Sequence, residues 1–415
     1  MANSEQEPFG IKSILSDLKI VLEYKELLIL IFAVFVSMIG FGLVMPFLPI
    51  YARDFGATKT HIGLMLGVFS IVKIAVAPIG GKLADMYGRK YIMVGGMFTY
   101  MVVMFLFGAA RTLPELFIYR GGQGAASGMV WPVAMTYIGD VVKKEDRGKA
   151  MGLYSMAFAS GNATGPVLGG LIASYYSLSV PFFFTSALAA TSGLLLLFGV
   201  KESYEGSRRK KSKKSRRNPL SFLKFNLSDI TPHPKTFLGL TVGSFTIFFG
   251  LSMVWSMLSL FGDEILYLTA FQISLIFTLI GVVQVVIMFP AGSLSDRIGR
   301  KKLIVSGALI SSVFAGVIGL STGFIFIMVA VAFYTFGRAL ARPSFPAFVS
   351  SLTSIEHRGK MMGIYNFAQN LAFATGSFLG GSVADVFGLR YPYFIALIVG
   401  IAGVAFIVVT VKEPD

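Results

Sequence analysis

The chain has 415 residues, of which 55% are hydrophobic and only 14% are charged. So few polar residues could not cover the surface of a soluble protein of this length, which excludes a typical soluble enzyme and favours an integral membrane protein. The net charge of +15 is then interpreted first as membrane topology and only second as affinity for nucleic acid.

Two residue types narrow the chemistry further. The chain contains no cysteine, which removes disulfides, thiolate metal sites and cysteine nucleophiles together. Its three histidines, His61, His233 and His357, lie far apart in the sequence and have no metal-ligand spacing. Because no nucleotide-binding loop or nucleophile arrangement is present either, we expect no metal, no cofactor and no enzyme activity.

Residues 1–25 are predicted to form a cytoplasmic amphipathic segment ahead of the first membrane span. Apolar residues recur there at helical spacing, at Ile11, Ile14, Leu15, Leu18, Val21 and Leu22. The pattern fits an interfacial helix that lies on the bilayer. It fits an ordinary amphipathic lead-in to the first span equally well, and the sequence leaves both open.

Twelve apolar stretches are long enough to cross a bilayer, which needs about 20 mostly apolar residues per helix. They lie near 27–51, 62–83, 91–110, 114–139, 149–173, 180–200, 237–261, 270–293, 302–320, 323–350, 360–383 and 392–411. The expected fold is an all-α membrane protein with two six-helix bundles, 26–202 and 236–415, joined by a cytoplasmic linker, 203–235.

The distribution of basic residues orients these spans. With both termini placed in the cytoplasm, the outside loops hold only Arg53, Lys59, Arg111 and Arg390, and most other Lys and Arg residues fall inside. This is the asymmetry of the positive-inside rule. The linker contains RRKKSKKSRR at 208–217, which we interpret as topology and contact with anionic lipids rather than as nucleic-acid binding.

The two halves of the chain align without a gap at a shift of 211 residues. The loop after the second span, with Gly81, Asp85 and Arg89, matches the loop after the eighth. The aligned pairs include Gly81 with Gly292, Asp85 with Asp296, Arg89 with Arg300, Arg147 with Arg358, and Glu202 with Glu413. Two bundles in the same membrane orientation are related by an axis along the membrane normal, as in a rocking transporter with its site between the halves.

At these residues the chain resembles the major facilitator superfamily, from about Leu27 to Lys412. GKLADMYGRK (81–90) and GSLSDRIGRK (292–301) match the cytoplasmic loop motif G-x-L-x-D-R-x-G-R-K, with Met86 in place of the usual Arg in the first copy. IGFGLVMPFLP (39–49), LFIYRGGQG (116–124) and GNATGPVLGG (161–170) resemble motifs of its twelve-helix drug:proton antiporters. The resemblance implies a monomer that transports a small-molecule substrate.

The duplicated loop motif is expected to form a gate. The resemblance implies that Asp85 faces the start of the eleventh helix and Asp296 the start of the fifth, which locks the cytoplasmic side while the cavity opens outward. A carboxylate suits the positive end of a helix, although local turn formation alone could also explain it. The predicted gating residues are Gly81, Asp85, Arg89, Arg147, Gly292, Asp296, Arg300 and Arg358.

The fifth helix carries a glycine stripe. Gly161, Gly165 and Gly169 are four residues apart, so they form a smooth face that admits a close neighbour, while Pro166 bends the span. A packing seam is the plain interpretation of this stripe. The family resemblance implies that the seam lies where the two halves meet.

Four basic residues remain inside the predicted spans, Lys73, Arg120, Arg338 and Arg342, with no carboxylate at similar depth. An unpaired cation in hydrocarbon costs about 2.5–3.5 kcal/mol even on translocon scales, so these side chains should face water or a ligand. Lys73 lies twelve residues before Asp85, about 18 Å along a helix, and therefore near the midplane.

Candidate cavity residues follow from depth, spacing and resemblance. Drug antiporters of the family commonly carry Gln at the position of Lys73 and at its repeat partner Gln284, which makes Lys73 a candidate for substrate selectivity. Arg338 and Arg342 are four residues apart and share one helix face. The full set is Lys73, Arg120, Trp255, Gln284, Arg338, Arg342, Gln369 and Asn370. Arg120 could equally pin its helix, and the polar residues could equally hydrogen-bond across a packing seam.

Proton coupling is harder to place. Antiporters of this family usually have a carboxylate in the cavity, but the seventh-helix position that we would inspect is Trp255. The proton could instead bind to Asp263 or Glu264 at the outer end, or to Lys73.

We therefore expect a secondary transporter that exports an organic solute or drug by alternating access, by proton antiport, from a cavity whose cations favour anionic or zwitterionic substrates. The alternatives are an organic-anion or lysolipid facilitator or symporter without proton antiport, and a non-transporting membrane receptor or scaffold. The expected partners are the substrate, protons and membrane lipids, without nucleic acid. The expected location is a prokaryotic plasma membrane.

Overall fold

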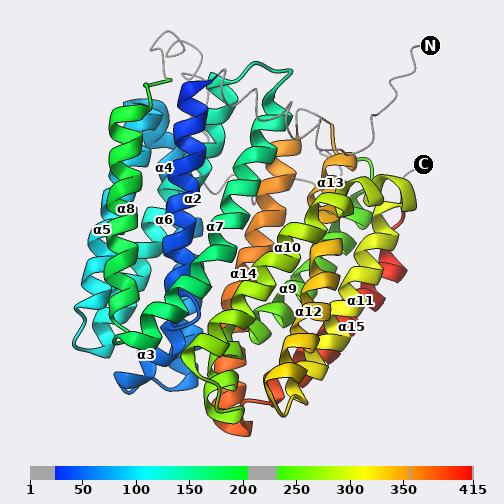
Figure 1. Cartoon of the computed structure of the whole chain (residues 1–415). Helices are drawn as coiled ribbons and strands as arrows, with labels where there is room; N and C mark the ends of the chain where they lie inside the picture. Colours follow the sequence, from blue (N-terminus) through cyan, green and yellow to red (C-terminus); the bar gives the residue numbers. More distant parts are fainter. Residues whose placement is uncertain (1–23, 204–230, 355–356, 414–415) are drawn as a thin grey trace.

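The computed structural model describes residues 24–203, 231–354 and 357–413, apart from the side chains of Phe289, Gly292, Ser293 and Asp296. The predicted amphipathic segment before residue 24 and the basic cluster 208–217 lie outside the described residues. The helices are α2 (Lys25–Val44), α3 (Leu48–Asp54), α4 (Lys59–Tyr87), α5 (Arg89–Gly108), α6 (Leu113–Val141), α7 (Arg147–Tyr175), α8 (Val180–Gly199), α9 (Pro234–Leu260), η5 (Phe261–Ile265), α10 (Ala270–Ile298), α11 (Arg300–Gly319), α12 (Phe324–Ala341), α13 (Ser344–Ser351), α14 (Arg358–Phe387) and α15 (Tyr391–Thr410) (Figure 1).

Within the described ranges these helices make twelve crossings, in two bundles of six, and each crossing coincides with a predicted span. The π-turn η5 continues α9, and α13 completes the crossing that α12 begins. An even number of crossings brings the start of α2 and the end of α15 to one side, which the basic residues identify as cytoplasmic. The predicted all-α, twelve-helix membrane fold is confirmed.

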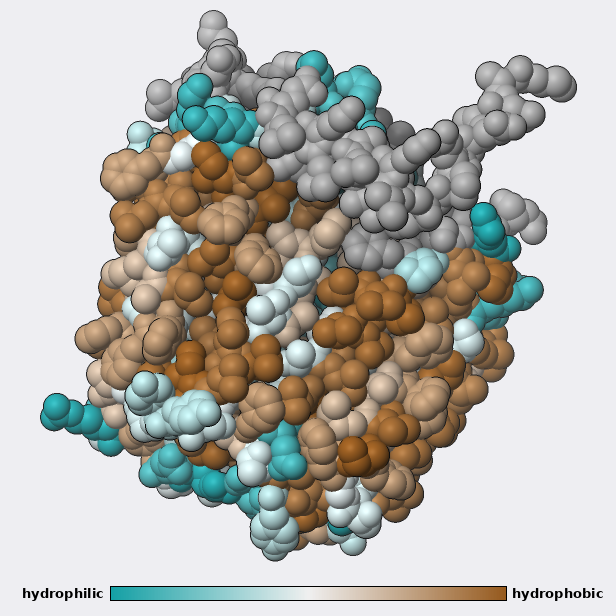
Figure 2. All heavy atoms as spheres, viewed as in Figure 1, coloured by the Kyte–Doolittle hydropathy of each residue, from teal (hydrophilic) through white to brown (hydrophobic). Residues whose placement is uncertain are grey.

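Hydropathy alone identifies only nine of these helices as candidate spans in the described part of the chain. The three that it misses, α6, α7 and α14, are rich in Gly, Ser and other small or polar residues. They pack against other helices on several sides, so they do not need an apolar surface toward lipid. Figure 2 shows the complementary surface, an apolar band with hydrophilic residues at both ends.

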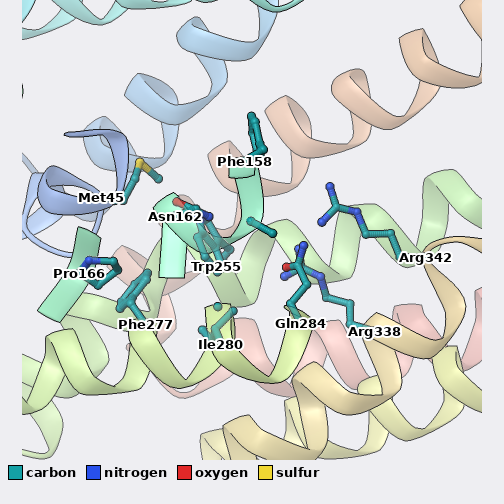
Figure 3. Close-up of a pocket in the computed structure, with 13 residues that line it drawn as sticks. Met45, Phe158, Asn162, Pro166, Trp255, Phe277, Ile280, Gln284, Arg338 and Arg342 are labelled. Atoms are coloured by element: carbon teal, nitrogen blue, oxygen red, sulfur yellow. The ribbon is translucent and has the colours of Figure 1, made fainter. Parts of the chain in front are cut away.

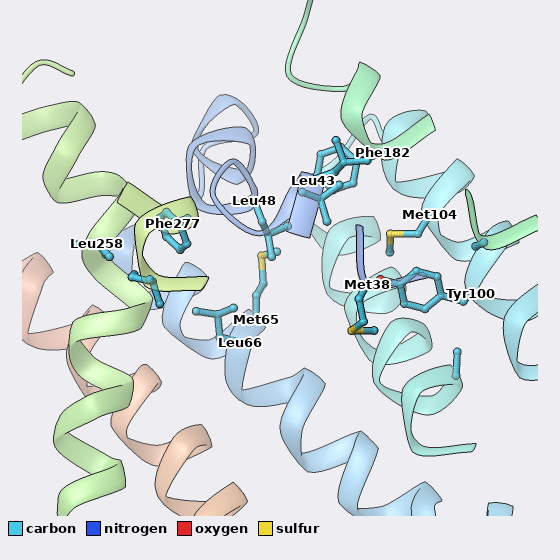
Figure 4. Close-up of a cluster of buried hydrophobic side chains, with 14 of the residues drawn as sticks. Met38, Leu43, Leu48, Met65, Leu66, Tyr100, Met104, Phe182, Leu258 and Phe277 are labelled. Atoms are coloured by element: carbon cyan, nitrogen blue, oxygen red, sulfur yellow. The ribbon is translucent and has the colours of Figure 1, made fainter. Parts of the chain in front are cut away.

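The helices pack as two bundles that meet along two contacts. In the first bundle, α2 packs against α7 and α8, and α6 packs against α4 and α5. In the second bundle, α9 packs against α14 and α15, and α11 packs against α12 and α15. Between the bundles, α4 packs against α14 and α7 against α10. The hydrophobic core crosses this boundary, since Met38, Met65 and Leu66 belong to the same buried cluster as Leu258 and Phe277 (Figure 4).

The 211-residue repeat is visible in the way the helices begin. Thr58 caps α4 by accepting a hydrogen bond from the His61 N–H at 3.3 Å, and Thr269 caps α10 by accepting from the Gln272 N–H at 3.3 Å. Such caps satisfy backbone donors that a helix start leaves open. The equivalent threonines therefore fix the outer ends of α4 and α10 in the same way.

In the two copies of the loop motif, α4 and α10 end at a glycine whose backbone conformation would be strained in any residue with a side chain. Gly88 has φ 105° and Gly299 has φ 104°, in the region that favours glycine. After Gly88, the N–H groups of Arg89 and Lys90 donate to the Glu202 carboxylate at 2.9 and 3.1 Å. The segment that follows α8 thus lies beside the start of α5, the third crossing of the first bundle. In the second bundle, Glu413 after α15 accepts the Lys301 N–H at the start of α11 at 2.8 Å.

The glycine stripe of α7 packs against α2 of its own bundle. A β-carbon at Gly161 would lie 2.5 Å from the Phe35 carbonyl oxygen, and Gly165 and Gly169 press on the backbone of α2 at Ile39 and Leu43 in the same way. The expectation that this stripe forms the boundary between the bundles was therefore wrong. A sequence of glycines shows that some helix comes close, but not which one.

Replacing Gly161 by alanine should destabilise the protein, whereas alanine at Gly152 should not. The first β-carbon meets a backbone carbonyl that cannot move aside, and overpacking of this kind costs about 1–3 kcal/mol. In the part of the chain that the structure describes, no neighbouring atom lies within 4 Å of a β-carbon at Gly152, on the same helix. Thermal unfolding in detergent should show a lower midpoint for Gly161→Ala only; equal midpoints would contradict this packing.

Candidate functional site

A pocket lies between the two bundles at mid-depth. It has a volume of about 170 Å³ and is formed by α2 and α7 from one bundle and by α9, α10 and the end of α12 from the other. Its lining residues are Gly42, Met45, Phe158, Ala159, Asn162, Pro166, Trp255, Phe277, Ile280, Gly281, Gln284, Arg338 and Arg342. A site shared by both halves is the one whose shape changes when the halves rock.

The pocket has a polar end and an apolar end (Figure 3). Gln284, Arg338 and Arg342 lie together on one side of the view, while Pro166 and Phe277 lie on the other. A ligand with one charged group and one apolar part would match both ends at once.

Arg338 and Arg342 stand one turn apart at the end of α12. The helix stops there because Pro343 has no N–H to continue it, and α13 starts at Ser344. The Arg338 guanidinium lies over the Trp255 ring at 5.7 Å, and Trp255 meets Phe277 edge to face at 5.2 Å. The aromatic pair therefore supports one arginine at the boundary between the polar and apolar parts of the pocket.

Arg342 is exposed to solvent although it belongs to the middle of the molecule. Lys73 of α4 is half-buried and lies within range of the Arg342 charge, but it is not among the residues that line the pocket. Arg338 also acts electrostatically on Arg342. Two cations of the second bundle thus line the pocket, and a third, from the first bundle, lies within electrostatic range of Arg342. The described lining residues include no carboxylate.

Arg120 does not reach this pocket. Its side chain is 2% exposed inside the first bundle, donates a hydrogen bond to Gln123, and lies over the Phe69 ring at 4.6 Å. Gln123 in turn donates to the Tyr100 hydroxyl at 3.0 Å. These contacts favour the interpretation in which Arg120 pins its helix.

Of the other predicted cavity residues, Trp255 and Gln284 line the pocket, and Gln369 and Asn370 do not. Gln369 donates to the Tyr365 hydroxyl, and Asn370 donates to the Asn366 carbonyl oxygen at 2.7 Å, both along α14 itself. Local bonds of this kind satisfy polar groups in a membrane helix without a ligand.

Sequence reasoning missed Asn162, a polar residue in the pocket wall. It follows Gly161 in the glycine-rich motif, and one residue turns a helix by about 100°. With Gly161 directed at α2, Asn162 points toward the centre. The signal was present in the sequence, but it required the direction of the glycine stripe.

The outer end between the bundles is closed by ion pairs. Arg53 lies 2.6 Å from Asp263 and 3.4 Å from Glu264, and the Lys59 ammonium lies 3.4 Å from Glu264. Burial alone would lower the pKa of the Arg53 guanidinium, but these two carboxylates outweigh it and raise the pKa. Asp263 and Glu264 are therefore part of the outer closure and lie outside the pocket.

Backbone packing reinforces this closure. Gly63 of α4 touches the Ser377 carbonyl of α14, and Gly67 packs on Ala374 one turn further in. At the cytoplasmic ends of the same helices, no neighbouring atom of the described residues lies within 4 Å of a β-carbon at Gly81 or Gly363. The bundles are thus joined outside and apart at the cytoplasmic side.

The predicted gating residues agree with an open cytoplasmic side. The Asp85 side chain is 69% exposed and lies 3.8 Å from Arg89 of its own bundle, so it is not buried against α14. Arg89 also pairs with Asp140, and Arg147 donates to the Val142 carbonyl oxygen at 3.3 Å. Arg300 donates to the Ala347 carbonyl oxygen at 2.9 Å, Arg358 begins α14, and the side chains of Gly292 and Asp296 lie outside the description.

The sequence profile described as Major Facilitator Superfamily matches residues 30–265 and 240–415. Multidrug resistance protein 2 of Bacillus subtilis is 28% identical over 377 residues, which cover 91% of this chain and 92% of that protein. Quinolone resistance protein NorA of Staphylococcus aureus is 26% identical over 387 residues, covering 93% and 96%.

Solved structures share the fold at lower sequence identity. The crystal structure of a bacterial homolog to the human lysosomal transporter Spinster, in an inward-facing and occupied conformation, matches with a TM-score of 0.78 and 14% identity. The match covers 94% of this chain and 98% of that one.

A single cysteine should report the open side, because the chain has no other thiol. Gly363 and Ala374 are eleven residues apart on α14, about three turns, and so share a face. Gly363→Cys borders open space and should react with a membrane-impermeant maleimide in inside-out vesicles, whereas Ala374→Cys, packed on Gly67, should react far more slowly. Equal rates would contradict an open cytoplasmic side.

Proposed function

The chain belongs to the major facilitator superfamily, and from this premise we propose that it exports a small organic solute or drug by alternating access with proton antiport. Its relatives named for multidrug and quinolone resistance support export of drug-like compounds. The open cytoplasmic side supports it too, because an exporter loads its substrate from that side.

The observation that carries the substrate proposal is the group of cations around the pocket. Arg338 and Arg342 line the pocket, and Lys73 lies within electrostatic range of Arg342. No carboxylate is among the described lining residues to neutralise them. Uncompensated positive charge in a low-dielectric site attracts an anion. The substrate is therefore an anionic or zwitterionic compound whose apolar part packs on Trp255 and Phe277.

We assign proton coupling to Lys73. Arginine stays protonated in proteins, so Lys73 is the cavity cation that can exchange a proton at working pH. Asp263 and Glu264, the other candidates, are held in the outer ion pairs. An antiport cycle in which Lys73 alternates between proton and substrate contact needs no cavity carboxylate.

A second candidate function is favoured by the same lack of a carboxylate in the described lining. A facilitator or symporter for an organic anion or lysolipid would need the cations but no proton antiport. The two candidates differ in whether an imposed pH gradient drives the substrate.

The setting of the protein follows from the family. It is an integral multi-pass membrane protein, and we place it as a monomer in a prokaryotic plasma membrane. The 208–217 segment, with its dense Lys and Arg, is proposed to contact anionic lipid headgroups on the cytoplasmic face.

Flux in proteoliposomes tests the proposal with two probes of similar size and opposite permanent charge, 1-naphthalenesulfonate and N-methylquinolinium. Arg338→Gln and Arg342→Gln should each reduce transport of the sulfonate about 10- to 100-fold, because a hydrogen bond to a charged group contributes about 1.5–3 kcal/mol. Arg111→Gln, which removes an exposed cation from an outer loop, is the matched control and should transport normally.

The pH gradient separates the candidates. Sulfonate flux that follows an imposed gradient, and that Lys73→Gln uncouples, would support proton antiport. Sulfonate flux that ignores the gradient would favour the facilitator. Transport of N-methylquinolinium with no effect of the two arginine variants would refute the anionic cavity.

A further inference from the structure

The outer end of α14 repeats the ending of α4 in sequence and in geometry. GGKLADMYG (80–88) and GGSVADVFG (380–388) share five positions of nine, and this likeness is separate from the 211-residue repeat. Gly88 and Gly388 both have φ 105°, and each donates its N–H to the alanine four residues earlier at 3.1 Å. Because α4 and α14 run in opposite directions, the two endings lie at opposite faces of the membrane.

Asp385, in the outer copy, spans the boundary between the bundles. Its carboxylate accepts the backbone N–H groups of Lys59 and Thr60 at 3.0 and 2.8 Å. These residues start α4, so the carboxylate lies at the positive end of that helix. Gly381, one turn earlier, touches the Lys59 carbonyl oxygen and allows the two helices to come this close.

The carboxylate is held in its charged form there. Burial alone would raise the pKa of Asp385, but hydrogen bonds from Thr60, Lys59 and Thr58 outweigh it and lower the pKa. The charged or titratable groups around it are Lys59 and His61 on α4, Arg53 on α3, and Asp263 and Glu264 on η5.

Among the described residues, the second boundary between the bundles has no carboxylate at the equivalent position. The residue that corresponds to Asp385 under the 211-residue repeat is Ser174 of α7, and the residues that correspond to Lys59 and Thr60 are Ala270 and Phe271 at the start of α10. The Ser174 hydroxyl donates to the Gly170 carbonyl oxygen of its own helix at 2.7 Å. The outer closure is therefore asymmetric.

We propose that Asp385 is the latch of the outer gate: it caps α4 while the outer side is closed and must leave that helix before the protein can open outward. It occupies, at the outer end of α14, the place that Asp85 occupies at the cytoplasmic end of α4. One helix pair thus carries a carboxylate at each end, and the two carboxylates serve opposite conformations. The inference depends on alternating access but not on the charge of the substrate.

The test measures conformation directly and needs no substrate. Spin labels on Ala109→Cys and Thr322→Cys, exposed outer-loop positions in the two bundles, report the opening of the outer side in a chain without other cysteines. In Asp385→Ala the outward-open population should rise about tenfold relative to the closed one, the scale of losing a helix cap and a charged contact.

The control is Glu115→Ala. Glu115 also accepts a backbone N–H at the outer end, that of Arg111 at 2.9 Å, but within its own bundle, so its loss should leave the distance distribution unchanged. The latch would be overturned if both Asp385→Ala and Glu115→Ala gave the same distance distribution as the unmodified protein. A shift of equal size in both variants would overturn it as well.

A gain-of-function variant keeps the test independent of any folding defect. Ser174→Asp places a carboxylate one turn beyond Gly170, which packs on Phe271 at the start of α10, and should favour the closed outer side. Combined with Asp385→Ala, it should return the distribution toward that of the unmodified protein. An unchanged distribution in Ser174→Asp would count against the latch.

The pH dependence distinguishes a latch from a proton switch. The released carboxylate has an ordinary pKa of about 3.9, and the latched one a lower pKa, so the stabilisation is complete above about pH 5 and is lost only as the pH falls further. The difference between the unmodified protein and Asp385→Ala should therefore stay constant from pH 5.5 to about 8. A difference that disappears within this range would overturn a permanently charged latch.

Discussion

The close approach of α4 to α14 and of α7 to α10, in their outer halves, is the contact on which the rest of the arrangement depends. Small residues such as Gly63 and Gly67 let backbone meet backbone there. Because rigid helices that touch at one end diverge at the other, the same contact leaves Gly81 and Gly363 beside open space. Water can then reach Arg342 in the centre of the molecule, which is what makes a charge at that depth tolerable.

The charges of the molecule are divided by depth. At the outer end opposite charges meet, and Arg53 and Lys59 pair with Asp263 and Glu264. In the pocket like charges gather, and the described lining offers Arg338 and Arg342 no carboxylate. Opposite charges attract and hold two surfaces together on their own. Like charges repel one another, and a bound ligand of opposite charge is needed to neutralise them. The division assigns closure to the outer end and recognition to the centre.

Much of the fold and part of the site could be predicted from the sequence. The twelve spans followed from the length of the apolar stretches, even for α6, α7 and α14, which a stricter hydropathy criterion does not find. Arg338 and Arg342 could be predicted from the sequence because an unpaired cation in the membrane costs free energy whatever the details of the structure, so such a residue must face water or a ligand. Arg120, Gln369 and Asn370 lie at similar depths but do not line the pocket, because depth is set by residue count and direction by helix rotation. Rotation also decided the partner of the glycine stripe and the position of Asn162.

Glu202 and Glu413 end the two bundles in the same way. Glu202 accepts the N–H groups at the start of α5, and Glu413 accepts that of Lys301 at the start of α11 at 2.8 Å. In each six-helix unit, a carboxylate that follows the last crossing therefore binds the start of the third crossing. Because each of these hydrogen bonds joins two parts of one unit, the two units can change their relative tilt without breaking them.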